Sequence, residues 1–420
     1  MTRNDYASGP FAQKTTLPNG VRVLTERLAH VDSVSLGLWV TSGVADDPVG
    51  CEGITHLIEH MLFKGTRARS SRVIAETIDD VGGSVNGITD REFMYLYART
   101  VRDHVETALD LLLDLLLHST SAADDLRREK EVVQQEIHLV EDTPEDWVHD
   151  LLLETAWPEH PLGKPVLGQS ASVKGIGCKA LLAHLGRLRA GRNLLVSAAG
   201  RVDHDRMVET VTRLTADVAP GVPRPPLSAP EFRAERVLIS RPTNQVHLCL
   251  ATPACRQTDP ERHAYAVLDT ILGGGTSSRL FHEIRETQGL AYSIGSYLQL
   301  FQSAGLFTVD AGTSPENFEL VLDLIGEEIA RLQADGPTAS EVERAKTQVR
   351  VAVALAAEST SFRMQHLAIS ELFWGRTLSF DEIIAGVAAV SAEDVHSTAR
   401  KVFAPEQTTL VAIGPFEEET

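Results

Sequence analysis

The chain has 420 residues, of which 43% are apolar and 23% charged, an ordinary composition for a soluble globular protein of two or three domains. Its 58 acidic and 39 basic residues give a net charge of -19, which disfavours binding to nucleic-acid phosphates. No run of 18 or more uncharged apolar residues occurs, and residues 1–16 lack the apolar segment of a secretion signal. We therefore expect a cytoplasmic protein with no nucleic-acid and no membrane partner.

The four cysteines, Cys51, Cys178, Cys249 and Cys255, show no C-x-x-C spacing and are too few for a disulfide framework. We interpret them as reduced thiols in a reducing compartment. Cys51 lies five residues before His56, close enough in sequence for a role in metal binding, but a small buried apolar residue is the more common role for such a cysteine.

Strand and helix patterns alternate in groups along the chain. The run Leu17-Pro-Asn-Gly20, followed by Val21 and Val23, predicts a hairpin turn, and the run from Phe93 to Ala98 predicts a strand. Strands that are grouped, and not strictly alternating with helices, favour an α+β fold over a doubly wound parallel sheet. Helical periodicity covers residues 102–117, 123–140, 315–334 and 338–357.

A proline-rich segment divides the chain into two parts that resemble each other. Five prolines fall between Pro220 and Pro230, which predicts a first half at 1–219, a linker at 220–231 and a second half at 232–420. Adding 212 to the numbers of the apolar run Val34, Leu36, Leu38 gives Val246, Leu248, Leu250, and each half ends in a strand pattern that closes on glycine, at 193–200 and 408–414. We therefore expect two similar halves, each a mainly antiparallel sheet flanked by helices.

The most informative motif is His56-Leu-Ile-Glu59-His60. On a helix, His56 and His60 lie one turn apart on the same face, so both imidazoles can bind one metal ion. Glu59 lies on a neighbouring part of that face, within reach of a water molecule held by the ion. A chance H-x-x-E-H is expected about 0.04 times in a chain of this composition, and this order of residues is the inverzincin zinc signature.

A catalytic zinc needs a third protein ligand and one open position. The predicted helix from Asp124 to Val140 offers Glu129, Glu131 and Glu136 as candidates. Spacing alone does not choose among them, and a run of charges on a helix is most often a solvated face.

These residues resemble the pitrilysin family of zinc peptidases, and most of all its short members related to the mitochondrial processing peptidase. The resemblance rests on His56-x-x-Glu59-His60 followed by Glu136 in Glu129-Lys-Glu-Val-Val-Gln-Gln-Glu136. It implies that Glu136 is the third zinc ligand of one Zn²⁺ per chain, and that Glu129 supports the catalytic site as a neighbouring carboxylate.

The resemblance covers nearly the whole chain. Further matching segments are Leu17 to Gly20, Gly82-Gly-Ser-Val-Asn86, His160-Pro-Leu-Gly163, Ser278-Arg-Leu-Phe281 and Arg285 to Tyr292. One departure is Gly87, where the family usually has alanine. A glycine there loosens an edge strand slightly, which bears on substrate preference more than on catalysis.

Only the first half carries the metal motif. Under the offset of 212, the residues His56, Glu59 and His60 correspond to Leu268, Ile271 and Leu272, none of which can bind zinc. The resemblance implies that Arg285 and Tyr292 of the second half hold substrate, since a guanidinium and a phenol can donate to a peptide carbonyl or a developing oxyanion. Neither a phosphate-binding G-x-x-x-x-G-K-[ST] loop nor a G-x-S-x-G motif occurs.

The sequence thus predicts a zinc metalloendopeptidase in which Glu59 is the general base. Substrate would add as a strand near Gly82 to Asn86, with Asn86 as a contact, so unfolded peptides or flexible tails fit best. The resemblance implies a homodimer that encloses a chamber, with Arg285 and Tyr292 facing the zinc of the partner chain. The alternatives are a catalytically silent structural or partner subunit of the same fold and, less favoured, a peptide-binding holdase with a structural zinc.

Overall fold

A computed structural model describes residues 12–222 and 224–417. Residues 1–11 of the polar stretch 1–16, in which the sequence shows no secretion signal, lie outside the described residues. Contacts divide the chain into two compact units: unit 1 comprises the described parts of 1–138, 165–225 and 355–381, and unit 2 those of 139–164, 226–354 and 382–420.

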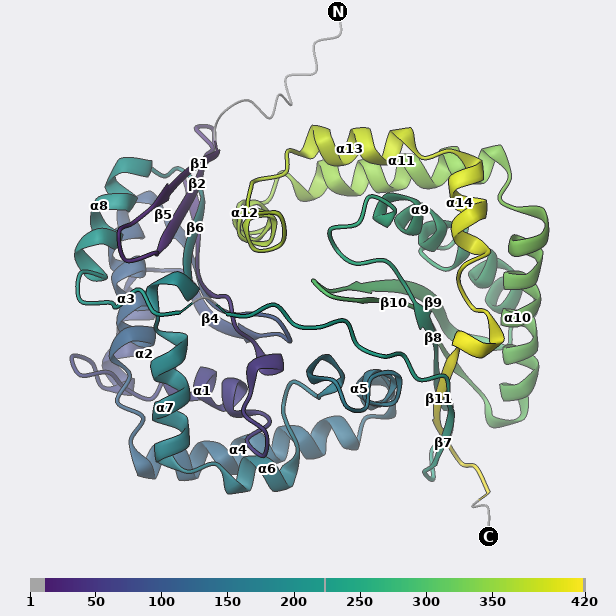
Figure 1. Cartoon of the computed structure of the whole chain (residues 1–420), viewed down its shortest axis with the longest axis horizontal. Helices are drawn as coiled ribbons and strands as arrows, with labels where there is room; N and C mark the ends of the chain where they lie inside the picture. The colour runs from purple at the N-terminus through teal and green to yellow at the C-terminus, as the bar shows by residue number, and fades with distance from the viewer. Residues whose placement is uncertain (1–11, 223, 418–420) are drawn as a thin grey trace, which may run out of the picture. The chain divides into compact units, whose positions relative to one another are not determined.

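Unit 1 is built on a six-stranded sheet with the strand order β1-β2-β6-β3-β5-β4 (Figure 1). Only β2 and β6 run parallel, and all other neighbours are antiparallel. The turn predicted at Leu17 to Gly20 joins β1 to β2, and Gly20 takes the positive φ of 90° that glycine tolerates best. The strands are β1 (Ala12–Thr16), β2 (Arg22–Arg27), β3 (Ser33–Val40), β4 (Ser84–Thr89), β5 (Met94–Val101) and β6 (Leu194–Gly200).

Helices cover both faces of this sheet because its inner strands are apolar on both sides. From β3, Leu36 and Leu38 pack into the main core with the helices around α1 and α3, while Trp39 packs against α12 on the opposite face. The helices of the main-core side include α1 (Ile54–Leu62), α2 (Ser71–Asp80), α3 (Val105–His118), α4 (Ala123–Glu141), α6 (Ser170–Gly175), α7 (Cys178–Leu188) and α8 (His204–Leu214), and α12 spans Thr360–Trp374.

Unit 2 repeats the architecture of unit 1. Its sheet has the order β7-β11-β8-β10-β9, which matches β2-β6-β3-β5-β4 strand for strand, including the single parallel pair. This confirms the α+β fold of two similar halves. The strands are β7 (Arg236–Ser240), β8 (Val246–Pro253), β9 (Ala291–Leu300), β10 (Gly305–Thr313) and β11 (Thr409–Gly414), and the helices are α5 (Pro144–Ala156), α9 (Arg262–Leu272), α10 (Phe318–Asp335), α11 (Ala339–Ala356), α13 (Phe380–Ala389) and α14 (Ala392–Ala399).

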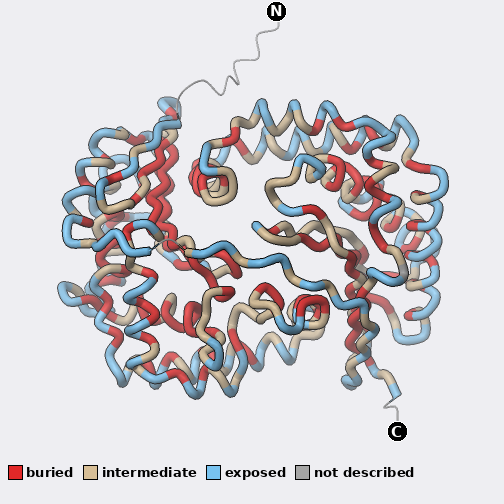
Figure 2. The backbone as a smooth tube through the Cα atoms, in the orientation of Figure 1, coloured by how far each residue is buried: buried red, intermediate tan, exposed pale blue. Residues whose placement is uncertain are grey.

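Each unit contains one helix from the other half of the sequence. Helix α5 precedes the proline-rich segment in the sequence, yet its Val148 and Leu152 pack on β8 and β11 of unit 2. Helix α12 follows that segment, yet its Met364 and Leu367 pack on the sheet of unit 1. Both helices bury an apolar face, and the central strands beneath them are buried along their length (Figure 2). The compact units therefore do not coincide with the contiguous halves 1–219 and 232–420.

The described part of the chain contains no helix that is long and apolar enough to cross a membrane. All four cysteines are free, and Cys51 is half-buried against the main core of unit 1.

Candidate metal centre

Helix α1 carries the motif because its apolar and polar residues separate on two faces. Its apolar side chains Ile54, Leu57, Ile58, Met61 and Leu62 are almost fully buried. The histidines therefore project together from the remaining face, as their spacing predicts.

The beginning of α1 is held by an acidic side chain. The carboxylate of Asp47 accepts the backbone N–H groups of Gly53 at 2.7 Å and Thr55 at 3.3 Å, and also the Thr55 hydroxyl. The Thr55 hydroxyl lies 2.9 Å from Nε2 of His184, whose Nδ1 accepts from Arg187. This network fixes the turn immediately before His56, because a carboxylate satisfies backbone donors at a helix N-terminus.

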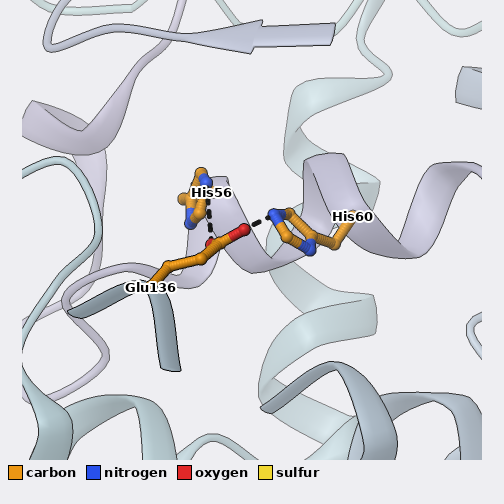
Figure 3. Close-up of side chains that lie close together, drawn as sticks. All are labelled: His56, His60 and Glu136. Atoms are coloured by element: carbon orange, nitrogen blue, oxygen red, sulfur yellow. Dashed lines mark ion pairs between the residues drawn. The ribbon is translucent and has the colours of Figure 1, made fainter. Parts of the chain in front are cut away.

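Glu136 of α4 lies opposite the two histidines of α1 (Figure 3). Its Oε2 atom is 3.5 Å from Nε2 of His60 and 3.9 Å from Nε2 of His56. One ligand atom from each of the three residues falls within 4.8 Å of the others, and this is the one such group found among the described residues.

This arrangement suits a zinc ion. Two nitrogens and a carboxylate oxygen form a ligand set that zinc commonly uses, and ligands of one tetrahedral zinc lie about 3.4 Å apart. Oε2 of Glu136 and Nδ1 of His56 are buried and have no hydrogen-bond partner among the described residues. Burial, and then the neighbouring His60, lower the pKa of His56 to about 3, so the imidazole is neutral near pH 7, as a metal ligand must be.

Glu129 contacts the candidate site at His60. Its Oε2 atom accepts from Nδ1 of His60 at 3.2 Å, and its Oε1 atom pairs with the Lys64 ammonium at 2.7 Å. A carboxylate on Nδ1 fixes the ring orientation and leaves Nε2 free to bind metal. Of the three candidate glutamates, the structure thus brings Glu129 and Glu136 to the histidines, whereas Glu131 is exposed on the same helix. Cys51 is not part of the group.

Glu59 lies between α1 and the edge strand β4. The Thr89 hydroxyl donates to its Oε2 atom at 2.5 Å. Burial raises the pKa of Glu59, while the Thr89 hydrogen bond and the charge of His60 act in the opposite direction. A carboxylate in this position can accept a proton and release it again, as a general base must.

Asn86 is exposed on β4, which is the last strand at its edge of the sheet among the described residues. Its Oδ1 atom accepts the backbone N–H of Gly87 at 2.9 Å.

Arg285 and Tyr292 lie close together in unit 2, while the group of His56, His60 and Glu136 lies in unit 1. Arg285 belongs to a π-helix, Phe281–Thr287, and Tyr292 to the start of β9. The guanidinium of Arg285 lies 5.8 Å from the ring centre of Tyr292 and 4.8 Å from that of Phe281. Both Arg285 and Tyr292 are exposed, so their polar groups are free to meet a ligand.

The profile described as "Insulinase (Peptidase family M16)" matches residues 22–170, and the profile described as "Peptidase M16 inactive domain" matches residues 180–349. An uncharacterized zinc protease of Streptomyces coelicolor is 38% identical over 97% of this chain and 90% of its own length. Another, of Bacillus subtilis, is 35% identical over 96% of this chain and 98% of its own length. This chain belongs to peptidase family M16. The pitrilysin-family resemblance found in the sequence is thereby confirmed.

Two solved structures share the M16 fold seen here. A peptidase M16 inactive domain from Pseudomonas fluorescens superposes with a TM-score of 0.89 at 22% identity and covers 97% of this chain and 99% of its own. A protease from Helicobacter pylori also gives a TM-score of 0.89, at 19% identity, with 96% and 99% covered.

The second half of this M16 chain has apolar residues where the first has its metal motif. Leu268, Ile271 and Leu272 are buried in α9, within the core of unit 2. Among the described residues, the candidate metal-binding group of this M16 protein therefore occurs in unit 1 alone.

Three residues that contact the candidate site residues or the helix that carries them were not identified from the sequence. Asp47 holds the start of α1, Lys64 pairs with Glu129, and Thr89 donates to Glu59. Only Lys64 carried a signal, its spacing of four residues from His60, although α1 ends before it at Leu62.

Proposed function

We propose that this chain is a zinc-dependent endopeptidase that cleaves unfolded peptides or flexible tails. The convergence of His56, His60 and Glu136, with the carboxylate of Glu59 beside them, is the observation that carries the proposal. The zinc-protease names of the relatives support zinc as the metal.

In this proposal His56, His60 and Glu136 hold one zinc ion per chain. A zinc ion held by these residues would supply Lewis acidity toward a water molecule and the scissile carbonyl. Glu59 accepts the proton of the attacking water and then delivers it to the leaving amine, so no covalent intermediate is needed. Glu129 keeps the ring of His60 in the orientation that presents Nε2.

The proposed substrate binds as an additional strand on the free edge of β4. Main-chain hydrogen bonds then supply affinity with little demand on sequence, and Asn86 lies at the point of contact. Folded proteins present few free strands, which favours unfolded chains as substrates. Arg285 and Tyr292 would donate hydrogen bonds to the peptide carbonyl or the developing oxyanion.

We further propose that two copies of the chain form a homodimer with an enclosed chamber, and that the enzyme works in the cytoplasm. The four free thiols fit a reducing compartment. In such a dimer, Arg285 and Tyr292 of one chain would serve the zinc centre of the other.

The test pairs Glu59→Gln with Glu131→Gln, which makes the same change at an exposed position of α4. Glu59→Gln should retain one zinc per chain and lose about 10²-fold to 10⁴-fold in kcat on a peptide that the wild type cleaves, while Glu131→Gln behaves as wild type. Zinc analysis and mass spectrometry of a digested peptide library measure both properties. A zinc-loaded wild-type protein that cleaves no peptide would instead support a catalytically silent subunit.

A further inference from the structure

Glu129 is a charged residue on the buried face of α4. The buried residues of this helix are Leu126, Glu129, Val133 and Ile137, and the other three are apolar. The Glu129 side chain is only 8% exposed. Burial of a carboxylate is costly unless its oxygens have hydrogen-bonding or ionic partners. The partners of Glu129 therefore decide whether its carboxylate can remain in this place.

The two oxygens of Glu129 contact different side chains. Oε2 accepts from Nδ1 of His60 at 3.2 Å, whereas Oε1 lies 2.7 Å from the Lys64 ammonium. The contact with Lys64 is the shorter one and joins opposite charges, and such contacts are stronger than those between neutral groups. A carboxylate is planar, so fixing Oε1 also limits the directions that Oε2 can take. The contact between Glu129 and His60 thus depends on Lys64.

The backbone at Lys64 is held by the residues around it. The N–H of Lys64 donates to the carbonyl of Met61 at 3.2 Å, in the turn that closes α1. Two residues later, Thr66 forms an antiparallel bridge with Ser119, and its hydroxyl donates to Asp114 at 2.7 Å. The Lys64 side chain is 36% exposed, so most of its length is covered. A held backbone and a covered side chain reduce the entropy that the lysine loses when it pairs with Glu129.

We propose that Lys64 is a positioning residue of the candidate metal centre: its ammonium holds Oε1 of Glu129, which keeps Oε2 on Nδ1 of His60. This inference rests on the proposed function. Without the ammonium, Glu129 has an unpaired oxygen in a site closed to water, and its side chain turns toward solvent and releases the ring of His60. Nε2 of His60 then no longer faces Glu136 in a fixed orientation. Lys64 therefore controls zinc affinity without contacting the metal.

The test measures the zinc dissociation constant of the metal-free protein by competition with a chromogenic chelator. Lys64→Met retains most of the side-chain length and removes the ammonium, so we expect about 10-fold weaker zinc binding, as when a supporting contact of a metal ligand is lost. Lys64→Arg keeps a cationic donor for Oε1 and should bind zinc within about twofold of wild type. The control is Lys179→Met, which removes the same charge from an exposed position of α7 and should leave the constant unchanged.

A second measurement asks whether Lys64 acts through Glu129. Lys64→Met introduced into Glu129→Gln should weaken zinc binding no further, because a residue that acts through another has no additional effect once the other is changed. If Lys64→Met does not fold, Lys64→Gln takes its place and is compared with Lys179→Gln. Lys64→Gln keeps one neutral donor for Oε1, so we expect a smaller loss of zinc affinity, about threefold.

Three results would overturn the inference. The first is zinc binding by Lys64→Met that is as tight as in the wild type, or tighter. The second is equal weakening by Lys64→Met and Lys179→Met, and the third is the same loss from Lys64→Met in the Glu129→Gln background as in the wild type. These measurements use no peptide, so failure of the peptidase function has a different signature: Glu59→Gln then cleaves peptide as fast as the wild type.

Discussion

Replacing Glu129 by glutamine should weaken zinc binding although Glu129 is not itself a proposed ligand. Its side chain is 8% exposed and accepts from two donors at once, Nδ1 of His60 at 3.2 Å and the Lys64 ammonium at 2.7 Å. A glutamine has one oxygen and one NH₂ group, so it can satisfy only one of these donors and must turn its own donor toward the other. Loss of such a supporting contact costs about 10-fold to 100-fold in metal affinity.

That range corresponds to about 1.4 to 2.7 kcal/mol of binding free energy. The assay is competition between the metal-free protein and a chromogenic chelator, which yields the zinc dissociation constant of each variant. Glu131→Gln removes the same charge from an exposed site on the same helix and should leave that constant unchanged. If Glu129→Gln binds zinc as tightly as wild type, or if both variants weaken it equally, Glu129 does not act through His60.

Three further predictions address stability, pH and assembly. Leu57→Ala should destabilise the protein by about 2 to 5 kcal/mol in urea denaturation, because Leu57 is fully buried behind the histidine face of α1. A change below about 1 kcal/mol would contradict this. Burial raises the pKa of Asp47 to about 7, whereas the same carboxyl in the unfolded chain has a pKa of about 4. Between about pH 4 and about pH 7 the folded state therefore binds a proton that the unfolded chain has lost, and the stability of the wild type falls as the pH rises through this range. Asn does not titrate, so the Tm of Asp47→Asn minus the Tm of the wild type should rise between about pH 4 and about pH 7. A constant Tm difference over this range would show that the pKa of Asp47 is not raised by folding. Mixing Arg285→Ala with Glu59→Gln chains should recover peptidase activity if Arg285 serves the partner's zinc, and no recovery would rule out that arrangement.

The sequence predicted those features that depend on neighbouring residues. The spacing of His56 and His60 placed both rings on one face of α1, and the predicted helices at 102–117, 123–140, 315–334 and 338–357 match α3, α4, α10 and α11 within a few residues. The offset of 212 predicted two similar halves, and the two sheets indeed share a strand order, since a duplicated pattern of apolar residues folds in the same way twice.

Other features depend on contacts between distant segments and carry no local signal. Glu129 and Glu136 are seven residues apart, hence two turns apart on one side of α4, whereas Glu131 points elsewhere. This difference between the glutamates identifies the ones that reach the histidines only once the position of α1 is known. Likewise, the apolar face of α5 indicates that the helix must be covered, but not which sheet covers it.

The reciprocal placement of α5 and α12 has a consequence for how the chain can be divided. A fragment cut at the proline-rich segment would retain α5 without β8 and β11, and would leave Trp39, Tyr95 and Leu195 of its own sheet open to water. Neither fragment is thus a self-sufficient folding unit, and each should aggregate when expressed alone. During synthesis, α12 is made only after most of the chain, so the face of the amino-terminal sheet that it covers stays exposed until then.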